Sequence, residues 1–337
     1  MNKVLSISIA AYNVEQYLDQ VLESLCVETV IEDLDILVIS DGSSDHTVAI
    51  AKAYEKRYPQ SIRVIEKENG GWGSTVNKGM ELAVGKYFKL LDGDDWFYSE
   101  NLEEFISLLK HSETDMVLSA FGMYDDAIQK VYAIKNMPFQ QGRQYNFEDV
   151  ATQCDIQMHG FAVRMDIIRQ AKIHIVDHCF YTDTQFVAEL FSHVSTMEYY
   201  AKPIYCYRIG REGQSVSPTG LLKHMGDNMR VAEELLGYNK TLQLSANIQK
   251  AYDKKINYVI TMELYSYCAL DKFERQAKLT EVMHFIKENN IVYEPSSAEV
   301  TLNLKTNFYF AGVIHTFFEV GRQLGKVLHV DLIQHVQ

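Results

Sequence analysis

Three aspartates stand almost side by side at the end of an apolar run. Asp92, Asp94 and Asp95 follow the segment KYFKLL (86–91), with only Gly93 between the first two. Like charges this close repel one another, so we expect a positive partner nearby or raised carboxyl pKa values. Carboxylate oxygens suit Mg²⁺ or Mn²⁺, which take one or two protein carboxylates and leave other positions for water and phosphate oxygens. The aspartates therefore favour a divalent-cation site.

Taken alone, the acidic turn is compatible with more than one role. It could be a solvated turn in which Ser99 or Asp95 caps the next helix, since caps of this type are common. An EF-hand calcium loop fails because Trp96 occupies a ligand position and Phe97 stands where the sharp turn needs glycine. The nearby stretch NGGWGST (69–75) is no P-loop, because it lacks the glycine-lysine-serine/threonine signature. The surroundings of the turn must decide between a cap and a cation site.

Strand and helix patterns alternate through the first hundred residues. Short apolar and β-branched runs predict strands, and apolar residues at helical spacing predict helices. The predicted strands are 4–10, 34–40, 61–67 and 86–91, and the predicted helices are about 13–25, 43–58 and 74–85. Asn13 is predicted to cap the first helix, with Gln16 completing a capping box. This alternation predicts an α/β fold with a mostly parallel sheet and right-handed crossovers.

Polar residues follow each of the four predicted strands. They are the stretch AYN (11–13), Asp41, the stretch ENGGWG (68–73) and the stretch DGDD (92–95). The carboxyl ends of parallel strands meet at one edge of a sheet, which is where open α/β sheets bind ligands. We therefore expect these four turns to form one site.

Composition and length limit the possible classes of protein. The 337 residues are enough for two domains, which we place at 1–217 and 218–337. The net charge of -13 argues against a nucleic-acid-binding surface, which needs clustered Lys and Arg. Five scattered cysteines without a CxxC pair indicate reduced thiols in a cytoplasmic protein. No run reaches the roughly 18 apolar residues of a membrane-spanning helix.

The last third of the chain has long helical patterns. They cover about 220–238, 245–270 and 272–290, and 293–303 is predicted to be a linker. The final segment, 307–330, carries an apolar stripe opposite Arg322 and Lys326. Three roles remain open for it: peripheral contact with the inner face of a membrane, an oligomer contact, or packing on its own core.

The ordered set of motifs resembles a known family. SISIAAYNVEQYL, LVISDGSSDHT, ENGGWGSTVNKGMELAVGKYFKLLDGDDW and FYTDTQF together resemble a family 2 glycosyltransferase with the GT-A fold, over about residues 4–215. The resemblance implies a Rossmann-like sheet and an inverting transfer of a sugar from a nucleotide diphosphate to an acceptor hydroxyl. It also implies Mn²⁺ or Mg²⁺ as cofactor, and a UDP-sugar is the expected donor. We expect a glycan, lipid-linked or protein acceptor in cell-surface glycan synthesis.

The resemblance also assigns donor-binding residues. Tyr12 resembles the residue that packs on the nucleotide base, and Asp41 resembles the acid that hydrogen-bonds the base. Gly73, Asn77 and Lys78 resemble the loop that closes over ribose and diphosphate. Many family members carry proline where this chain has an alanine before Tyr12, which leaves the shape of that first loop open.

The acids match the family's DxD motif and its general base. Asp92 resembles the ribose or metal contact, and Asp94 resembles the metal ligand. Asp95 would contact the metal indirectly or bind the sugar. Asp183, in YTDTQF, matches the general base, although an acid before an apolar helix can also be a cap or first-turn charge. Arg211 is predicted to contact the diphosphate, with a surface pair to its neighbouring glutamate as the alternative.

Two further residues border the predicted cleft. Trp96 could stack on a sugar, but core packing accounts for it equally well. His159 could border the acceptor, although a single histidine is more often structural.

Two other functions also stay open. A nucleotidyltransferase usually carries a glycine-rich basic loop after the first strand, and AAYNVEQYL has neither feature. A non-catalytic nucleotide-sugar-binding protein would have no need of Asp183.

Overall fold

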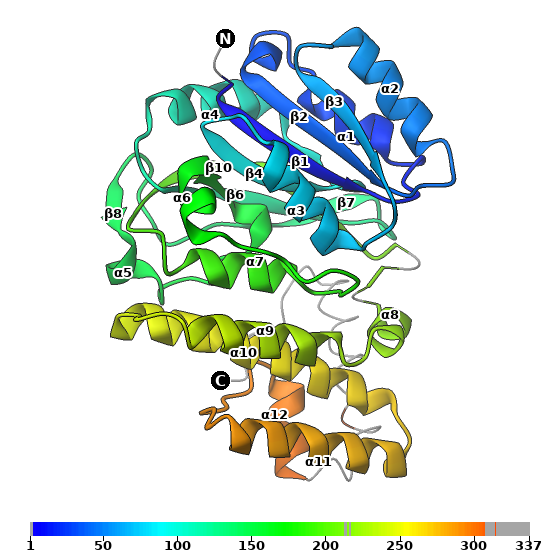
Figure 1. Ribbon diagram of the computed structural model, residues 1–337, viewed down its shortest axis with the longest axis vertical. Coiled ribbons are helices and arrows are strands. Elements are labelled where there is room, and N and C mark those ends of the chain that lie inside the picture. Colours follow the sequence, from blue (N-terminus) through cyan, green and yellow to red (C-terminus); the bar gives the residue numbers. More distant parts are fainter. Residues whose placement is uncertain (1–2, 212–213, 216, 307–313, 315–337) are drawn as a thin grey trace. The chain divides into compact units, whose positions relative to one another are not determined.

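The computed structural model describes residues 3–211, 214–215, 217–306 and 314. The chain divides into two compact units (Figure 1). The first comprises Met1–Arg211 and Tyr238–Ala251, and the second comprises Glu212–Gly237 and Tyr252–Gln337.

The first unit is built on one mixed sheet, as the alternating sequence pattern predicts. Its order is β3 (Ile62–Lys67), β2 (Leu34–Asp41), β1 (Leu5–Ala11), β4 (Tyr87–Asp92), β9 (Phe161–Arg164), β6 (Met116–Asp125), β10 (Thr196–Ile209) and β5 (Trp96–Phe97). In addition, β7 (Lys130–Lys135) pairs with β6, and β8 (Gln144–Asn146) pairs with β10. The pairs β3–β2, β2–β1, β1–β4 and β6–β10 are parallel, whereas β9 runs antiparallel to both β4 and β6.

Helices cover both faces of this sheet (Figure 1). One face carries α1 (Leu18–Leu25), α2 (Thr47–Arg57) and α4 (Ser99–His111), and the other carries α3 (Trp72–Leu82), α6 (Met165–Ala171) and α7 (Asp183–Leu190). The short α5 (Phe147–Val150) and a 3-10 turn, Met158–Gly160, precede β9. Because the sheet is covered twice, β1 and β2 are almost entirely buried on both faces, and Ile7, Ile9 and Leu37 have no exposed surface.

Two predictions about the first helices were wrong in detail. The helix that Asn13 was to cap begins at Leu18, and Asn13 itself takes a left-handed backbone with φ of 51°. Its side chain instead accepts a hydrogen bond from the Ser44 amide at 2.8 Å, which joins the loop after β1 to the loop after β2. The second helix begins at Thr47 rather than residue 43.

The C-terminal third is helical, as predicted. It contains α8 (Pro218–Lys223), α9 (Asp227–Asn239), α10 (Ala246–Ser266), α11 (Lys272–Glu288) and α12 (Ala298–Lys305), with a 3-10 turn at Tyr267–Ala269. The predicted linker was wrong from Ala298 onward, because Ser297 caps α12 by accepting a hydrogen bond from the Val300 amide.

Three further predictions concern membranes and cysteines. The segment 307–330 lies outside the described residues, apart from residue 314. Within the described part, no helix combines the length and apolar character that a bilayer crossing requires. All five cysteines are free thiols.

Candidate functional site

Strand direction brings the polar turns to one edge of the sheet. Asp41 ends β2 and Asp92 ends β4, while Tyr12 follows β1 directly. The antiparallel β9 starts where β4 ends, so His159 arrives at the same edge from the opposite direction. Since β10 is parallel to β6, its end carries Arg208 to this edge as well.

Asp92 lies in the middle of the acidic cluster. Its Oδ1 accepts a hydrogen bond from the Trp72 indole Nε1 at 2.7 Å, so α3 fixes the orientation of the carboxyl group. Burial raises the pKa of Asp92 to about 7, with further contributions from the charges of Asp94 and Asp183, while Trp72 and Arg211 oppose the rise. A carboxyl group of this kind gives up its proton readily when a cation arrives.

Asp95 lies deeper than Asp92 and is held on both oxygens. Tyr205 donates its hydroxyl to Oδ2 at 2.5 Å, and the Arg208 backbone amide donates to Oδ1 at 2.7 Å. Burial, followed by the charges of Asp94 and Asp92, raises the pKa of Asp95 well above its usual value. The structure therefore fixes the direction of this carboxyl group through β10.

Two arginines supply the positive charge that the sequence led us to expect. Arg211 Nε donates to Asp94 Oδ2, and Arg208 Nε donates to the Asp94 carbonyl at 2.8 Å. The buried Arg208 guanidinium also donates hydrogen bonds to Asp126 and Gln20, so it joins the acidic turn to α1 and to the residues after β6. The predicted alternative for Arg211, a surface pair with its glutamate neighbour, involves a residue outside the described part of the chain.

Asp183 stands at the start of α7, close to the acids of β4. Asp183 is the first residue of α7 and therefore lies in the first helical turn. Thr182 is the N-cap residue, and its side chain makes no cap hydrogen bond. The charge of Asp183 raises the pKa of Asp92 and of Tyr207. Two acids 91 positions apart in sequence thus act on each other electrostatically.

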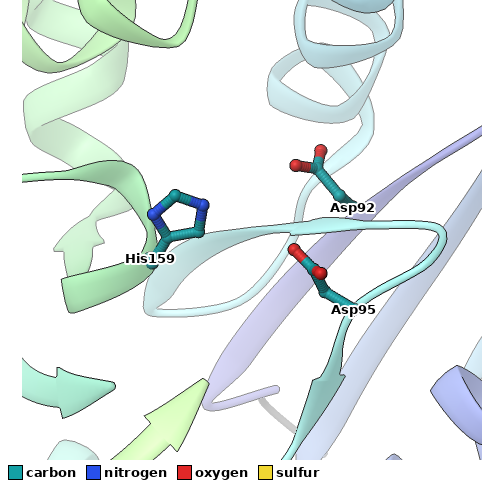
Figure 2. Close-up of side chains that lie close together, drawn as sticks. All are labelled: Asp92, Asp95 and His159. Carbon is teal, nitrogen blue, oxygen red and sulfur yellow. The ribbon is translucent and has the colours of Figure 1, made fainter. Parts of the chain in front are cut away.

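His159 faces the acids from the turn before β9 (Figure 2). One ligand atom from each of Asp92, Asp95 and His159 lies within 4.8 Å of the others. Burial, together with the charge of Lys89, lowers the pKa of His159 to about 3, so the ring stays neutral. The Lys89 amine is itself buried, which lowers its pKa to about 7, and it donates to the His159 carbonyl at 2.7 Å.

Asp41 is buried, and both of its carboxyl oxygens accept hydrogen bonds from within the protein. Its Oδ1 accepts from the Gly70 amide at 2.9 Å and from Lys67 Nζ at 2.5 Å, and its Oδ2 accepts from the Gly71 amide at 2.8 Å. Asp41 therefore shapes the turn between β3 and α3. Tyr12 differs, because 54% of its surface is exposed.

The three residues predicted to lie in a closing loop lie in helix α3 instead. The Asn77 side chain pairs with the backbone of Ile175 in both directions, donating at 2.7 Å and accepting at 2.9 Å. At Gly73, an added Cβ would stand 2.4 Å from the Val176 carbonyl oxygen. Lys78 forms an ion pair with Glu81, one turn further along the helix. The structure thus sets Gly73 and Asn77 against segment 175–176.

Trp96 is half-buried beside the acidic turn. The Arg208 guanidinium lies 4.8 Å from its ring centre, and Tyr124 contacts the ring edge-on at 5.0 Å. These contacts account for the position of Trp96 by packing.

Sequence reasoning missed Lys89 and Tyr205. Both had a visible signal: Lys89 is the one charged residue inside the apolar run YFKLL, and Tyr205 alternates with Tyr207 in IYCYRI, as residues on one face of a strand do.

Comparison with known proteins identifies the family. Residues 6–187, more than half of the chain, match the family described as glycosyl transferase family 2. The chain belongs to this family.

Relatives and solved structures agree with that assignment. An uncharacterized glycosyltransferase of Haemophilus influenzae is 26% identical over 332 residues, covering 94% of this chain and 98% of that protein. EpsH of Bacillus subtilis, a putative glycosyltransferase, is 29% identical over 219 residues, and the match covers 60% of each chain. This family 2 glycosyltransferase also has the fold of S. aureus TarS 1–349 in complex with UDP-GlcNAc. That likeness has a TM-score of 0.54 at 16% identity and covers 90% of this chain and 92% of TarS 1–349.

Proposed function

We propose that this family 2 glycosyltransferase moves a sugar from a nucleoside diphosphate, with UDP as the nucleotide, to an acceptor hydroxyl with inversion. The observation that carries the proposal is that acids from the turn after β4 gather with His159 at the carboxyl edge of the sheet, where Asp183, at the start of α7, acts on Asp92 electrostatically. A base for the acceptor and a site for the leaving group must lie near one another, because both act on the same anomeric carbon. The UDP-GlcNAc complex of TarS, which shares the fold, supports UDP as the nucleotide.

Asp183 acts as the general base in this proposal. It takes the proton of the acceptor hydroxyl as the acceptor oxygen forms a bond to the anomeric carbon. The bond from that carbon to the diphosphate oxygen breaks, and the nucleoside diphosphate leaves with the electron pair. Attack and departure on opposite sides of the carbon give inversion.

The acids of β4 fit a divalent cation of the kind that the family implies. Asp92 is half-buried and its carboxyl group is oriented by the Trp72 indole, and Asp94 follows two positions later in the same turn. Among the described residues, the His159 ring faces Asp92 and Asp95 without a hydrogen bond of its own. We assign Asp92 and Asp94 as ligands of Mn²⁺ or Mg²⁺. When bound, the cation neutralises charge that develops on the departing diphosphate.

The remaining residues have proposed binding roles. Tyr12 stacks on the base, for which its exposure is suitable. Asp41 hydrogen-bonds the nucleotide base, and Gly73, Asn77 and Lys78 shape the part of the site that holds the donor. Arg211 contacts the diphosphate through its guanidinium.

The acceptor side is proposed separately. Asp95, Trp96 and His159 contact the sugar or the acceptor. For residues 307–330 the three roles of contact with a membrane surface, contact in an oligomer and packing on the core are separated by liposome flotation and sedimentation of the full chain.

A donor scan tests the proposal. The full chain is incubated with a panel of nucleotide sugars and Mn²⁺, and the released nucleotide is identified. Release of nucleoside diphosphate supports glycosyl transfer, whereas release of pyrophosphate would show nucleotidyl transfer, and no release with any donor would favour a binding protein.

One substitution tests the base. Asp183→Asn is expected to fold, to keep UDP affinity and to lose about 100-fold or more in transfer rate. Asp149→Asn removes an exposed acid in α5 and serves as the control. Near-normal turnover of Asp183→Asn would exclude Asp183 as base.

A further inference from the structure

His159 is a positioned polar ring without a polar partner. It is 7% exposed, and its buried Nδ1 has no hydrogen-bond partner in the described part of the chain. Among the described residues, no hydrogen bond to either ring nitrogen exists. A buried imidazole without a partner is costly, so its presence here points to a functional role.

Aromatic packing fixes the orientation of this ring. Tyr207 stacks on it with ring centres 4.3 Å apart, Tyr205 meets it edge-on at 4.9 Å, and Phe121 lies at 5.5 Å. Lys89 Nζ holds the backbone at this point by donating to the carbonyls of His159 and Phe161 at 2.7 and 2.9 Å. The ring is therefore held in place by contacts that involve neither of its nitrogens, and the nitrogen that faces the two carboxyl groups is Nε2 (Figure 2).

The ring points at two oriented carboxyl groups. Figure 2 shows one ring nitrogen turned toward the side chains of Asp92 and Asp95. Trp72 orients Asp92 and Tyr205 orients Asp95, and hydrogen bonds of this kind direct ligands toward a metal in many sites. Asp94, in contrast, is bound by Arg211.

The spacing suits one cation among the three groups. Ligand atoms from Asp92, Asp95 and His159 all lie within 4.8 Å of one another. Ligands on opposite sides of a cation stand about 4.2 Å apart, because cation–ligand distances are about 2.1 Å. A small contraction of the three side chains would therefore complete three coordination bonds and leave further positions for the diphosphate.

We infer that His159 is a nitrogen ligand of the cation, together with Asp92 and Asp95, and that it makes the site prefer Mn²⁺ to Mg²⁺. The preference follows because imidazole suits transition metals, whereas Mg²⁺ prefers oxygen ligands. This inference rests on the proposed cation requirement. It changes which residues hold the ion, because the DxD resemblance assigned Asp94 where we now place Asp95 and His159. For Asp95 and His159 it replaces the sugar or acceptor contact proposed above.

The first test detects a nitrogen ligand of the bound ion directly. Mn²⁺ is bound to the full chain without donor, and electron spin echo envelope modulation is recorded for ¹⁴N coupled to the ion. We expect ¹⁴N modulation in the wild type and its loss in His159→Phe, which keeps the ring stacking on Tyr207. His111→Phe, which removes an exposed histidine from α4, should keep the signal.

Affinity gives a second readout. Calorimetric titration should show that His159→Phe loses about tenfold or more in Mn²⁺ affinity, while Mg²⁺ affinity changes less. His159→Gln provides a smaller polar replacement should the phenylalanine variant not fold, which circular dichroism checks.

The outcomes separate the two proposals. Wild-type chain that binds Mn²⁺ without ¹⁴N modulation, or modulation that persists in His159→Phe, would overturn the inference and leave the proposed function standing. Wild-type chain that binds no Mn²⁺ at all, with or without UDP, would overturn the cation requirement as well.

Discussion

Removing the buried charge of Lys89 should change how stability depends on pH. Lys89 lies in the middle of β4 with 1% of its surface exposed, and no carboxylate of the described residues is within ion-pair distance of its amine. Within the described part of the chain the amine donates to two carbonyl oxygens, which do not compensate for the lost hydration of an ammonium. Burial accordingly lowers the pKa of Lys89 to about 7 in the folded chain.

The sign and size of the effect follow from linkage. An unfolded lysine has a pKa of about 10.4, so between pH 7.5 and 9.5 the unfolded chain holds a proton at this position that the folded chain has largely released. Stability rises with pH wherever the unfolded state binds more protons. Integrated over this range, Lys89 adds about 2–3 kcal/mol to the free energy of unfolding at the higher pH.

Lys89→Met isolates this contribution. Urea unfolding is followed at pH 7.5 and 9.5 with EDTA present, by the fluorescence of Trp72 and Trp96, which both lie in the first unit. His159, whose pKa the charge of Lys89 lowers, stays neutral above pH 7.5 in both proteins. The wild type should therefore gain about 2–3 kcal/mol over the variant as pH rises. Lys52→Met, which removes an exposed lysine from α2, should parallel the wild type. Parallel curves for wild type and Lys89→Met would refute the argument.

Two further predictions concern the packing around two glycine positions and the hydrogen bonds of Asn77. An alanine Cβ at Gly79 would stand 2.0 Å from Ser8 Oγ, so Gly79→Ala should destabilise the chain by about 1–3 kcal/mol. Gly237 in α9 has no atom within 4 Å of an added Cβ, so Gly237→Ala should be neutral or stabilising by up to about 1 kcal/mol, and thermal unfolding of both variants checks the contrast. Asn77→Ala removes both hydrogen bonds to Ile175, so hydrogen exchange of the Ile175 amide should accelerate about tenfold; unchanged exchange would show that packing alone holds this segment.

Local patterns in the sequence were sufficient for the parallel half of the sheet. The runs at 4–10, 34–40, 61–67 and 86–91 became β1, β2, β3 and β4 within one residue or so, because short runs rich in β-branched and apolar residues are typical of strands in a covered sheet. The position of the four polar turns at one edge of the sheet then followed from the parallel direction of these strands. Helix starts were less predictable, since Asn13 bonds to a residue of another loop and not to the helix that follows it.

The sequence by itself determined the family, the α/β class and the acids at the end of β4, because these depend on residue types and on spacing along the chain. Only the tertiary structure decided which groups face those acids. His159 lies beside them because β9 is inserted antiparallel between β4 and β6. This pairing joins segments that are distant in sequence, so the hydrophobic periodicity of a single segment cannot predict it. The same non-local pairing buries Lys89 against the carbonyls of the turn that carries His159.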